Sequence, residues 1–196
     1  MAVKRFYETF HPEHYDLFID VDRGKKLIKG TSTITGEAQT DTVLINQKYM
    51  KVSSVRADGK DVPFTVSDKD EAIKVDLSKT GKTTIKIDYS APLTDSMMGI
   101  YPSYYEVDGV KKELIGTQFE TTAARQAFPC VDEPEAKATF SLALKFDEHD
   151  GEIAIANMPE TKVENGVHYF EKSVRMSSYL VAFAFGELQS KMTETK

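Results

Sequence analysis

The feature that most constrains the fold is an alternation of apolar and polar residues with a period of two. In "HYDLFIDVD" the apolar residues Tyr15, Leu17, Ile19 and Val21 alternate with His14, Asp16, Asp20 and Asp22. Successive side chains of a β-strand point to opposite faces, so this run predicts a strand with one buried face. Three similar runs, "AIKVDL", "TTIKIDY" and "ATFSLALKF", place on one face Ile73, Val75, Leu77, Ile85, Ile87, Tyr89, Phe140, Leu142, Leu144 and Phe146.

Turn signals separate these runs at short intervals. Asp58-Gly59, Asp108-Gly109 and Asn165-Gly166 are dipeptides that supply the positive φ of tight hairpins. Strands spaced in this way favour an all-β fold, an antiparallel β-sandwich with at most short helical turns. The one expected helical turn covers residues 121–127 and ends near Pro129, since the residue before a proline disfavours helix. Close to the C-terminus, "SYLVAFAFGEL" is apolar on both faces and predicts a buried central strand.

Length and charge limit the organisation and the partners. With 196 residues, we expect a single β-sandwich domain over residues 1–190, followed by a polar tail or linker over residues 191–196. The formal net charge of -6 argues against general binding to nucleic acid or to anionic membranes. No segment approaches a transmembrane span or a secretory signal, and a single cysteine cannot form an internal disulfide, so we expect a cytoplasmic location.

The residue types that usually bind metals or act as nucleophiles lack the required spacing. Four histidines are present, but Pro12 keeps the pair in "HPEH" off one helix face, and nothing resembles HExxH or a Cys/His cluster. We therefore expect this chain to bind no metal. Carboxylates next to Cys130 would raise the pKa of its thiol, which favours a small buried apolar role. A GxSxG serine signature is also absent.

The densest mixture of polar groups lies in "TQFETTAARQAFPCVDEPEAKATF", residues 117–140. Asp132 and Glu133 are adjacent, so on an extended chain they point to opposite faces and are poorly placed to flank one glycosidic bond. A loop-forming role fits them better. Gln118 and Glu120 share one face. If that face is open they are simply solvated, which spacing alone favours; if it lines a cleft, an amide and a carboxylate form a receptor for a primary ammonium.

The same segment closely resembles the one found in the aminopeptidase N family of zinc metallopeptidases, the gluzincin aminopeptidases. "HPEHYDLFIDVD" is similar to the family's first strand, "MMGIYPSYY" to the region upstream of the Gln-x-Glu strand, and "SSYLVAFAFGEL" to the strand that closes the N-terminal domain. The resemblance covers essentially the whole chain in the family's order. It implies the saddle-like N-terminal β-sandwich domain of a larger enzyme, without the thermolysin-like catalytic domain that carries GxMEN and the HExxH zinc site.

By this resemblance, Glu120 binds the free α-amino group of a peptide substrate, and Gln118 lines the pocket for its first side chain. The zinc ion and the catalytic residues belong to the absent catalytic domain, so none are expected in this chain. The implied function is the substrate-anchoring domain of a cytoplasmic zinc aminopeptidase that hydrolyses single residues from peptide N-termini in peptide catabolism. Its partners are peptides with a free N-terminus and the parent's catalytic domain. Alone, the chain is expected to be inactive.

Two other classes of function stay open. One is a standalone β-sandwich module for binding or adhesion to carbohydrate or protein. Sugar-binding faces usually present aromatic platforms, and the chain has no Trp but nine Tyr. The other is a scaffold that exposes an interaction surface. Reading the gene beyond Lys196 discriminates the enzyme from the module: in-frame GxMEN and HExxH motifs favour the enzyme, and a stop codon favours the module.

Overall fold

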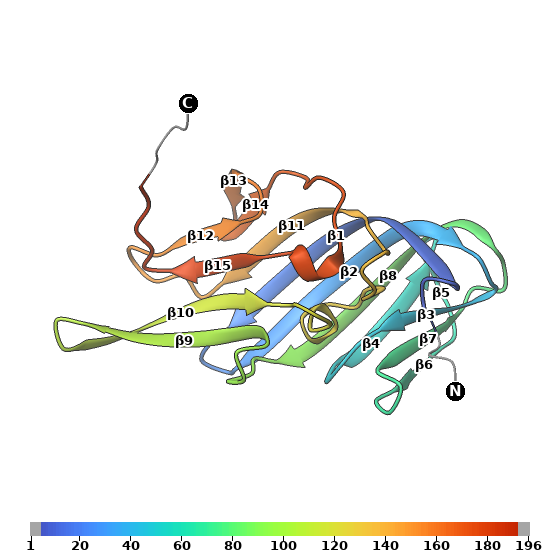
Figure 1. The fold of residues 1–196 in the computed structure, drawn as a ribbon, viewed down its shortest axis with the longest axis horizontal. Coiled ribbons are helices and arrows are strands. Elements are labelled where there is room, and N and C mark those ends of the chain that lie inside the picture. Colours follow the sequence, from blue (N-terminus) through green and yellow to red (C-terminus); the bar gives the residue numbers. More distant parts are fainter. Residues whose placement is uncertain (1–4, 192–196) are drawn as a thin grey trace.

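A computed structural model describes residues 5–191 (Figure 1). Two 3-10 turns, η1 (Ala124–Gln126) and η2 (Ser178–Leu180), accompany the strands. The fifteen strands are β1 (Phe10–Asp22), β2 (Leu27–Ala38), β3 (Thr42–Asn46), β4 (Lys51–Ala57), β5 (Lys60–Asp61), β6 (Phe64–Ser67), β7 (Ala72–Asp76), β8 (Gly81–Pro92), β9 (Gly99–Val107), β10 (Val110–Gln118), β11 (Thr139–Phe146), β12 (Ile153–Ala156), β13 (Glu160–Glu164), β14 (Val167–Phe170) and β15 (Phe183–Gly186).

The strands form three sheets around one core. The large sheet has the order β13-β14-β11-β1-β2-β8-β4-β5, and two smaller sheets have the orders β12-β15-β10-β9 and β3-β7-β6. In Figure 1 the four-stranded sheet crosses one end of the large sheet, and the three-stranded sheet lies near the other end, beside β4 and β5. Phe146 of β11 stacks on Phe185 of β15 at 4.0 Å between ring centroids, so the large and four-stranded sheets share their core. The predicted all-β sandwich is confirmed.

The alternating runs occupy strands as predicted. Their apolar residues are all buried, and the helical turn expected over residues 121–127 is η1. The three predicted hairpins also form: Asp58-Gly59 connects β4 to β5, Asp108-Gly109 connects β9 to β10, and Asn165-Gly166 connects β13 to β14, with positive φ at every one of these residues. The pairing is not entirely antiparallel, because β1 and β11 run parallel. More than a hundred residues separate these two strands, so no hairpin fixes their relative direction.

The prediction for "SYLVAFAFGEL" is wrong in part. β15 does lie inside its sheet, between β12 and β10, but only one of its faces is buried. Phe183 and Phe185 point into the core, whereas Ala182 is exposed and Ala184 is half-buried. Nothing in residues 5–191 forms a layer over the other face. The predicted polar tail, apart from the exposed Lys191, lies outside the described residues.

No helical segment within residues 5–191 has the length and apolar character needed to cross a membrane.

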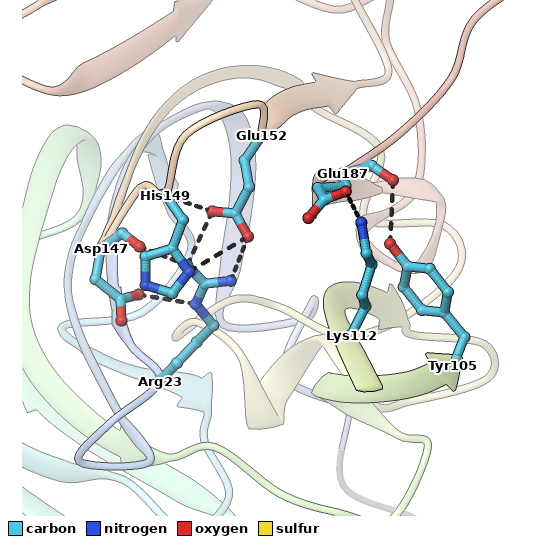
Figure 2. Close-up of polar contacts among 7 residues, drawn as sticks. All are labelled: Arg23, Tyr105, Lys112, Asp147, His149, Glu152 and Glu187. Carbon is cyan, nitrogen blue, oxygen red and sulfur yellow. Dashed lines mark hydrogen bonds and ion pairs between the residues drawn. The ribbon is translucent and has the colours of Figure 1, made fainter. Parts of the chain in front are cut away.

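A buried arginine ties the layers together at one end (Figure 2). Arg23 follows β1, and its guanidinium donates to both carboxylate oxygens of Glu152 at 2.6 and 2.9 Å and to Asp147 Oδ1 at 3.0 Å. The same group lies over the ring of Phe185, 5.5 Å from its centroid. Burial would raise the pKa of Glu152, but hydrogen bonds from Arg23 and from the His149 backbone hold this pKa below its ordinary value. Arg23 thus joins the β1–β2 turn, the β11–β12 loop and β15.

We predict that Arg23→Met lowers the free energy of unfolding by about 3 kcal/mol, because it leaves the Glu152 carboxylate buried without its partner. The folded-state pKa of Glu152 is depressed, so this stabilisation is present near neutral pH and is lost as pH falls through that pKa. Urea denaturation should therefore show the gap between wild type and variant shrinking from about pH 7 to about pH 3. Lys162→Met, which removes the exposed pair with Glu164, is the control and should change little. A gap that is constant with pH would contradict the assignment.

Candidate functional site

The end of β10 carries the residues that the sequence singles out. Gln118 is the last residue of β10 and pairs with Gly99 of β9. Phe119 then turns into the core, where it is 2% exposed, and Glu120 follows on the surface. The Gln118 amide nitrogen donates to the backbone carbonyl of Glu120 at 3.4 Å, so the structure brings the two residues together. Within residues 5–191, the Glu120 carboxylate has no ion pair and no hydrogen-bond donor.

The backbone on either side of this pair is fixed. The Thr117 hydroxyl accepts the N–H of Phe183 at 3.1 Å and donates to its carbonyl at 3.2 Å, which locks β10 to β15. Phe119 packs edge-on against Phe128, with 5.8 Å between ring centroids. The carbonyl of Phe119 accepts the N–H of Ala123 at 2.8 Å and starts the turn into η1. Gln118 and Glu120 therefore stand on a rigid support.

Hydroxyl groups on the inner face of the large sheet support the segment that follows η1. One each comes from β1, β2 and β8, and each bonds a backbone group that is otherwise buried. The three bonds are Tyr89 Oη to the Ala127 carbonyl at 2.7 Å, Ser32 Oγ to the Pro129 carbonyl at 2.9 Å, and the Val131 N–H to Tyr15 Oη at 3.0 Å. A buried backbone group without a partner is costly, so these hydroxyls determine the path of residues 127–131.

The tyrosine of β8 reaches its partner only because a glycine faces it. Gly30 of β2 pairs with Tyr89, and a Cβ at Gly30 would lie 2.5 Å from the Tyr89 hydroxyl oxygen. Any larger residue would displace the ring and its bond to Ala127. Burial raises the pKa of Tyr89, so the hydroxyl stays protonated and keeps its role as a donor.

An ion pair between Arg125 and Asp132 also holds this segment in place. Asp132 is 3% exposed, and its Oδ2 accepts Arg125 Nε at 3.0 Å and the Arg125 backbone N–H at 3.3 Å. Ser178 of η2 donates to the other carboxylate oxygen at 2.7 Å. Burial alone would lower the pKa of Arg125, but Asp132 and Glu71 raise it. Asp132 is therefore a loop-forming residue, as predicted.

Cys130 and Glu133 also hold the segment in place. Cys130 is fully buried, and its backbone pairs with Asn46 at the end of β3. Burial, followed by the charge of Asp132, raises the pKa of the thiol, as expected of an inert packing residue. Glu133 points the other way and accepts the backbone N–H groups of Phe6 and Tyr7. Asp132 and Glu133 therefore have different partners and share no site.

The histidines take part in local contacts. His14 bonds Thr139 at 2.8 Å, His11 stacks on Tyr7, and His168 is buried with its Nδ1 2.8 Å from Glu160. Within residues 5–191, no group of three or more His, Cys, Asp or Glu side chains could hold a metal ion. The described residues therefore offer no site for the zinc ion, which the resemblance assigns to the catalytic domain.

Comparison with known proteins agrees with this fold and order of motifs. The Peptidase M1 N-terminal domain family matches residues 11–180. The chain belongs to the aminopeptidase N family, as an N-terminal domain. It is 74% identical to aminopeptidase N of Lactobacillus delbrueckii subsp. lactis and 72% identical to that of Lactobacillus helveticus, in each case over 100% of this chain. Over 98% of the chain it is 34% identical to mouse endoplasmic reticulum aminopeptidase 1. It spans 23% of the length of each of these relatives.

The sequence pattern did not reveal the buried hydroxyl groups that support the site. Ser32 was the available signal, because it occupies an inward position on β2 between Gly30 and Ile34, where an apolar residue is the rule. A hydroxyl on a buried face needs a partner, and a buried carbonyl elsewhere in the chain is the common one. Which carbonyl it meets depends on the tertiary fold and could not be read from spacing.

We predict that Tyr89→Phe lowers the free energy of unfolding by about 1–3 kcal/mol, because the Ala127 carbonyl loses its donor in a buried place. Chemical denaturation measures the change. Tyr104→Phe is the matched control, since Tyr104 is 63% exposed, and it should change the stability by less than about 0.5 kcal/mol. Equal stabilities of the wild type and Tyr89→Phe would rule out a supporting role for this bond.

Proposed function

We propose that this domain anchors the free N-terminus of a peptide substrate within a parent aminopeptidase. The observation that carries the proposal is the exposed Glu120 carboxylate, which has no partner in the described residues yet stands beside Gln118 on a fixed strand end. The relatives of known name are aminopeptidases, and such enzymes act on peptides that present a free amine. An unpaired carboxylate on a backbone that is held in place suits an ammonium ligand, because the position of its backbone is set before binding.

The interaction energy favours selectivity over affinity. A carboxylate about 4 Å from an ammonium gains roughly 4 kcal/mol at an effective dielectric constant of 20, and desolvation of both charges cancels part of this gain. A peptide whose amine is blocked would bury Glu120 without a partner. This penalty rejects internal segments of a peptide and so selects its N-terminal end.

Gln118 complements this role as part of the wall around the first substrate side chain. Its amide nitrogen is engaged with the Glu120 carbonyl, so the amide plane is oriented and its oxygen remains available as an acceptor. The proposal assigns no catalytic role to these two residues. Their contribution is to hold and orient the substrate, while cleavage is assigned to the remaining part of the parent protein. The cytoplasmic location expected from the sequence stays a prediction.

The isolated chain should be inactive. We expect the pure 196-residue polypeptide, supplied with zinc, to give no cleavage of aminoacyl chromogenic substrates above the blank. The reason is that no metal-ligating group of side chains occurs within residues 5–191. Turnover by the pure chain that a chelator abolishes would refute this expectation.

In the intact parent protein, we predict that Glu120→Gln lowers kcat/KM for free-amine peptides by about 30- to 1,000-fold, equivalent to about 2–4 kcal/mol of lost charge pairing. Metal content, measured by elemental analysis, should not change. Glu164→Gln, an exposed carboxylate on β13, is the control and should retain wild-type kcat/KM. If Glu120→Gln also retained it, Glu120 would be excluded from the site.

A further inference from the structure

One aromatic residue breaks the alternation on the outer face of the large sheet, the face opposite to the core. Leu17 and Ile19 of β1 point into the core, so Phe18 between them points outward, where it is half-buried. The outward residues on either side of it, Asp16 and Asp20, are polar. Because a solvated sheet face normally carries polar side chains, Phe18 departs from the pattern of its face.

A second aromatic ring lies in register with Phe18. Tyr169 of β14, Ala143 of β11 and Phe18 form one row, because Ala143 pairs with both aromatic residues. Their three strands run side by side in the large sheet (Figure 1). Adjacent strands are about 4.8 Å apart, so the two aromatic residues start about 10 Å apart with only a methyl group between them. These three residues line a hollow of about 290 Å³, which we call the aromatic slot.

Oxygen atoms border one side of the aromatic slot. Asp16 of β1 pairs with Ser141 of β11 and with Thr33 of β2, and all three residues line the hollow. The Asp16 side chain is 61% exposed, and His14 Nε2 lies 3.1 Å from its carboxylate and 3.4 Å from Ser141 Oγ. A carboxylate accepts about four hydrogen bonds, so most of the acceptor capacity of Asp16 remains free. The two hydroxyls can each donate and accept.

The charges around the aromatic slot favour a neutral ligand. Among the described residues that line it, Asp16 is the only charged one, and it repels an anion. Lys162 of β13, which is paired with Glu164 at 2.7 Å, also lies over the Tyr169 ring, with Nζ 4.7 Å from the ring centroid. It thus occupies a place where an aromatic ring would receive a cationic ligand.

A sugar ring matches this combination of surfaces. Its faces carry C–H groups that pack against aromatic rings, and its edge carries hydroxyls that donate to a carboxylate and exchange hydrogen bonds with threonine and serine. Ligand sites are mostly apolar hollows with a few placed polar groups, and they usually enclose about 300–1,000 Å³. The aromatic slot lies at the small end of this range, so it suits a single ring of a longer chain.

We propose that the aromatic slot binds one ring of a neutral oligosaccharide, with Phe18 and Tyr169 against its C–H faces and Asp16 at its hydroxyl edge. The slot is distinct from the candidate substrate site, because Gln118 ends β10 of the four-stranded sheet, which packs on the core face of the large sheet. Binding here would attach the protein to glycans without taking part in peptide cleavage. For so small a contact we expect a dissociation constant of about 1 mM.

Saturation-transfer difference NMR of the intact parent protein tests the proposal, because this method detects weak binding to a large protein. The probes are cellohexaose, maltohexaose and chitohexaose, each at about 5 mM, well above the expected dissociation constant. A peptide-like inhibitor is present to block the peptide-cleaving site. At least one of the sugars should receive saturation at its ring C–H protons. No transfer to any of the three would overturn the proposal.

Removal of either ring should weaken the binding. We expect Phe18→Ser and Tyr169→Ser each to raise the dissociation constant at least about fivefold, because each deletes one stacking surface. Tyr104→Ser is the matched control, since Tyr104 is a 63% exposed tyrosine on β9, and it should bind as the wild type does. Unchanged kcat/KM for a free-amine peptide shows that each variant is folded. Wild-type binding by both Phe18→Ser and Tyr169→Ser would overturn the proposal.

Ala143→Leu fills the aromatic slot while both rings stay in place. The side chain at position 143 points outward, between the buried Leu142 and Leu144, so a leucine there extends into the hollow and leaves the core unchanged. It should weaken the binding at least about tenfold, because it occupies the space of the sugar ring. Wild-type affinity in Ala143→Leu would overturn the proposal even if the serine variants failed to fold.

A cationic probe separates a sugar site from an aromatic cage for cations. Tetramethylammonium at the same concentration should receive no saturation from the wild type. Transfer to it that Phe18→Ser abolishes would overturn the proposal in favour of a cation site. None of these measurements depends on Glu120, so unchanged turnover by Glu120→Gln would undermine the proposed function and leave the sugar site standing.

Discussion

Buried hydrogen bonds to the segment 127–132 are the constraint on which the rest of the structure depends. This segment passes through the core between the large sheet and the smaller ones, where its backbone groups have no access to water. Three hydroxyls of the large sheet bond backbone groups of Ala127, Pro129 and Val131, and the Arg125 guanidinium donates to the Asp132 carbonyl. Hydrogen bonds are directional, so these partners fix the path of the segment. The end of β10, which leads into the segment through η1, is thereby held at one place on the surface.

The candidate site inherits its rigidity from this interior. Phe119 joins β10 to the buried aromatic cluster, so the residues on either side of it are held outward with little freedom. Glu120 is thereby an exposed charge on a backbone that is held in place. The buried carboxylate of Asp132, in contrast, is matched by Arg125 and Ser178 and serves the fold. The Asp132 carboxylate is paired and the Glu120 carboxylate is not, because only the first is buried, and a buried charge must be paired.

Local patterns predicted most of the fold. Period-two alternation identified the buried faces of β1, β7, β8 and β11, and the three Gly-containing dipeptides located hairpins, since both signals depend only on neighbouring residues. The parallel pairing of β1 with β11 and the uncovered face of β15 depend on distant parts of the chain, so the sequence pattern missed them. Spacing placed Gln118 and Glu120 on one face but left their function open. The resemblance supplied a function, and their roles in substrate binding stay a prediction.

The central claim, that Glu120 binds the substrate's ammonium group, is tested most directly by a thermodynamic cycle in the intact parent protein. Inhibition constants are measured for a peptide-like inhibitor with a free amine and for its des-amino analogue, against the wild type and Glu120→Gln. A coupling energy of about 2 kcal/mol, or roughly a 30-fold greater loss for the amine, is the expected result. Equal losses for both inhibitors, and hence no coupling, would contradict the claim.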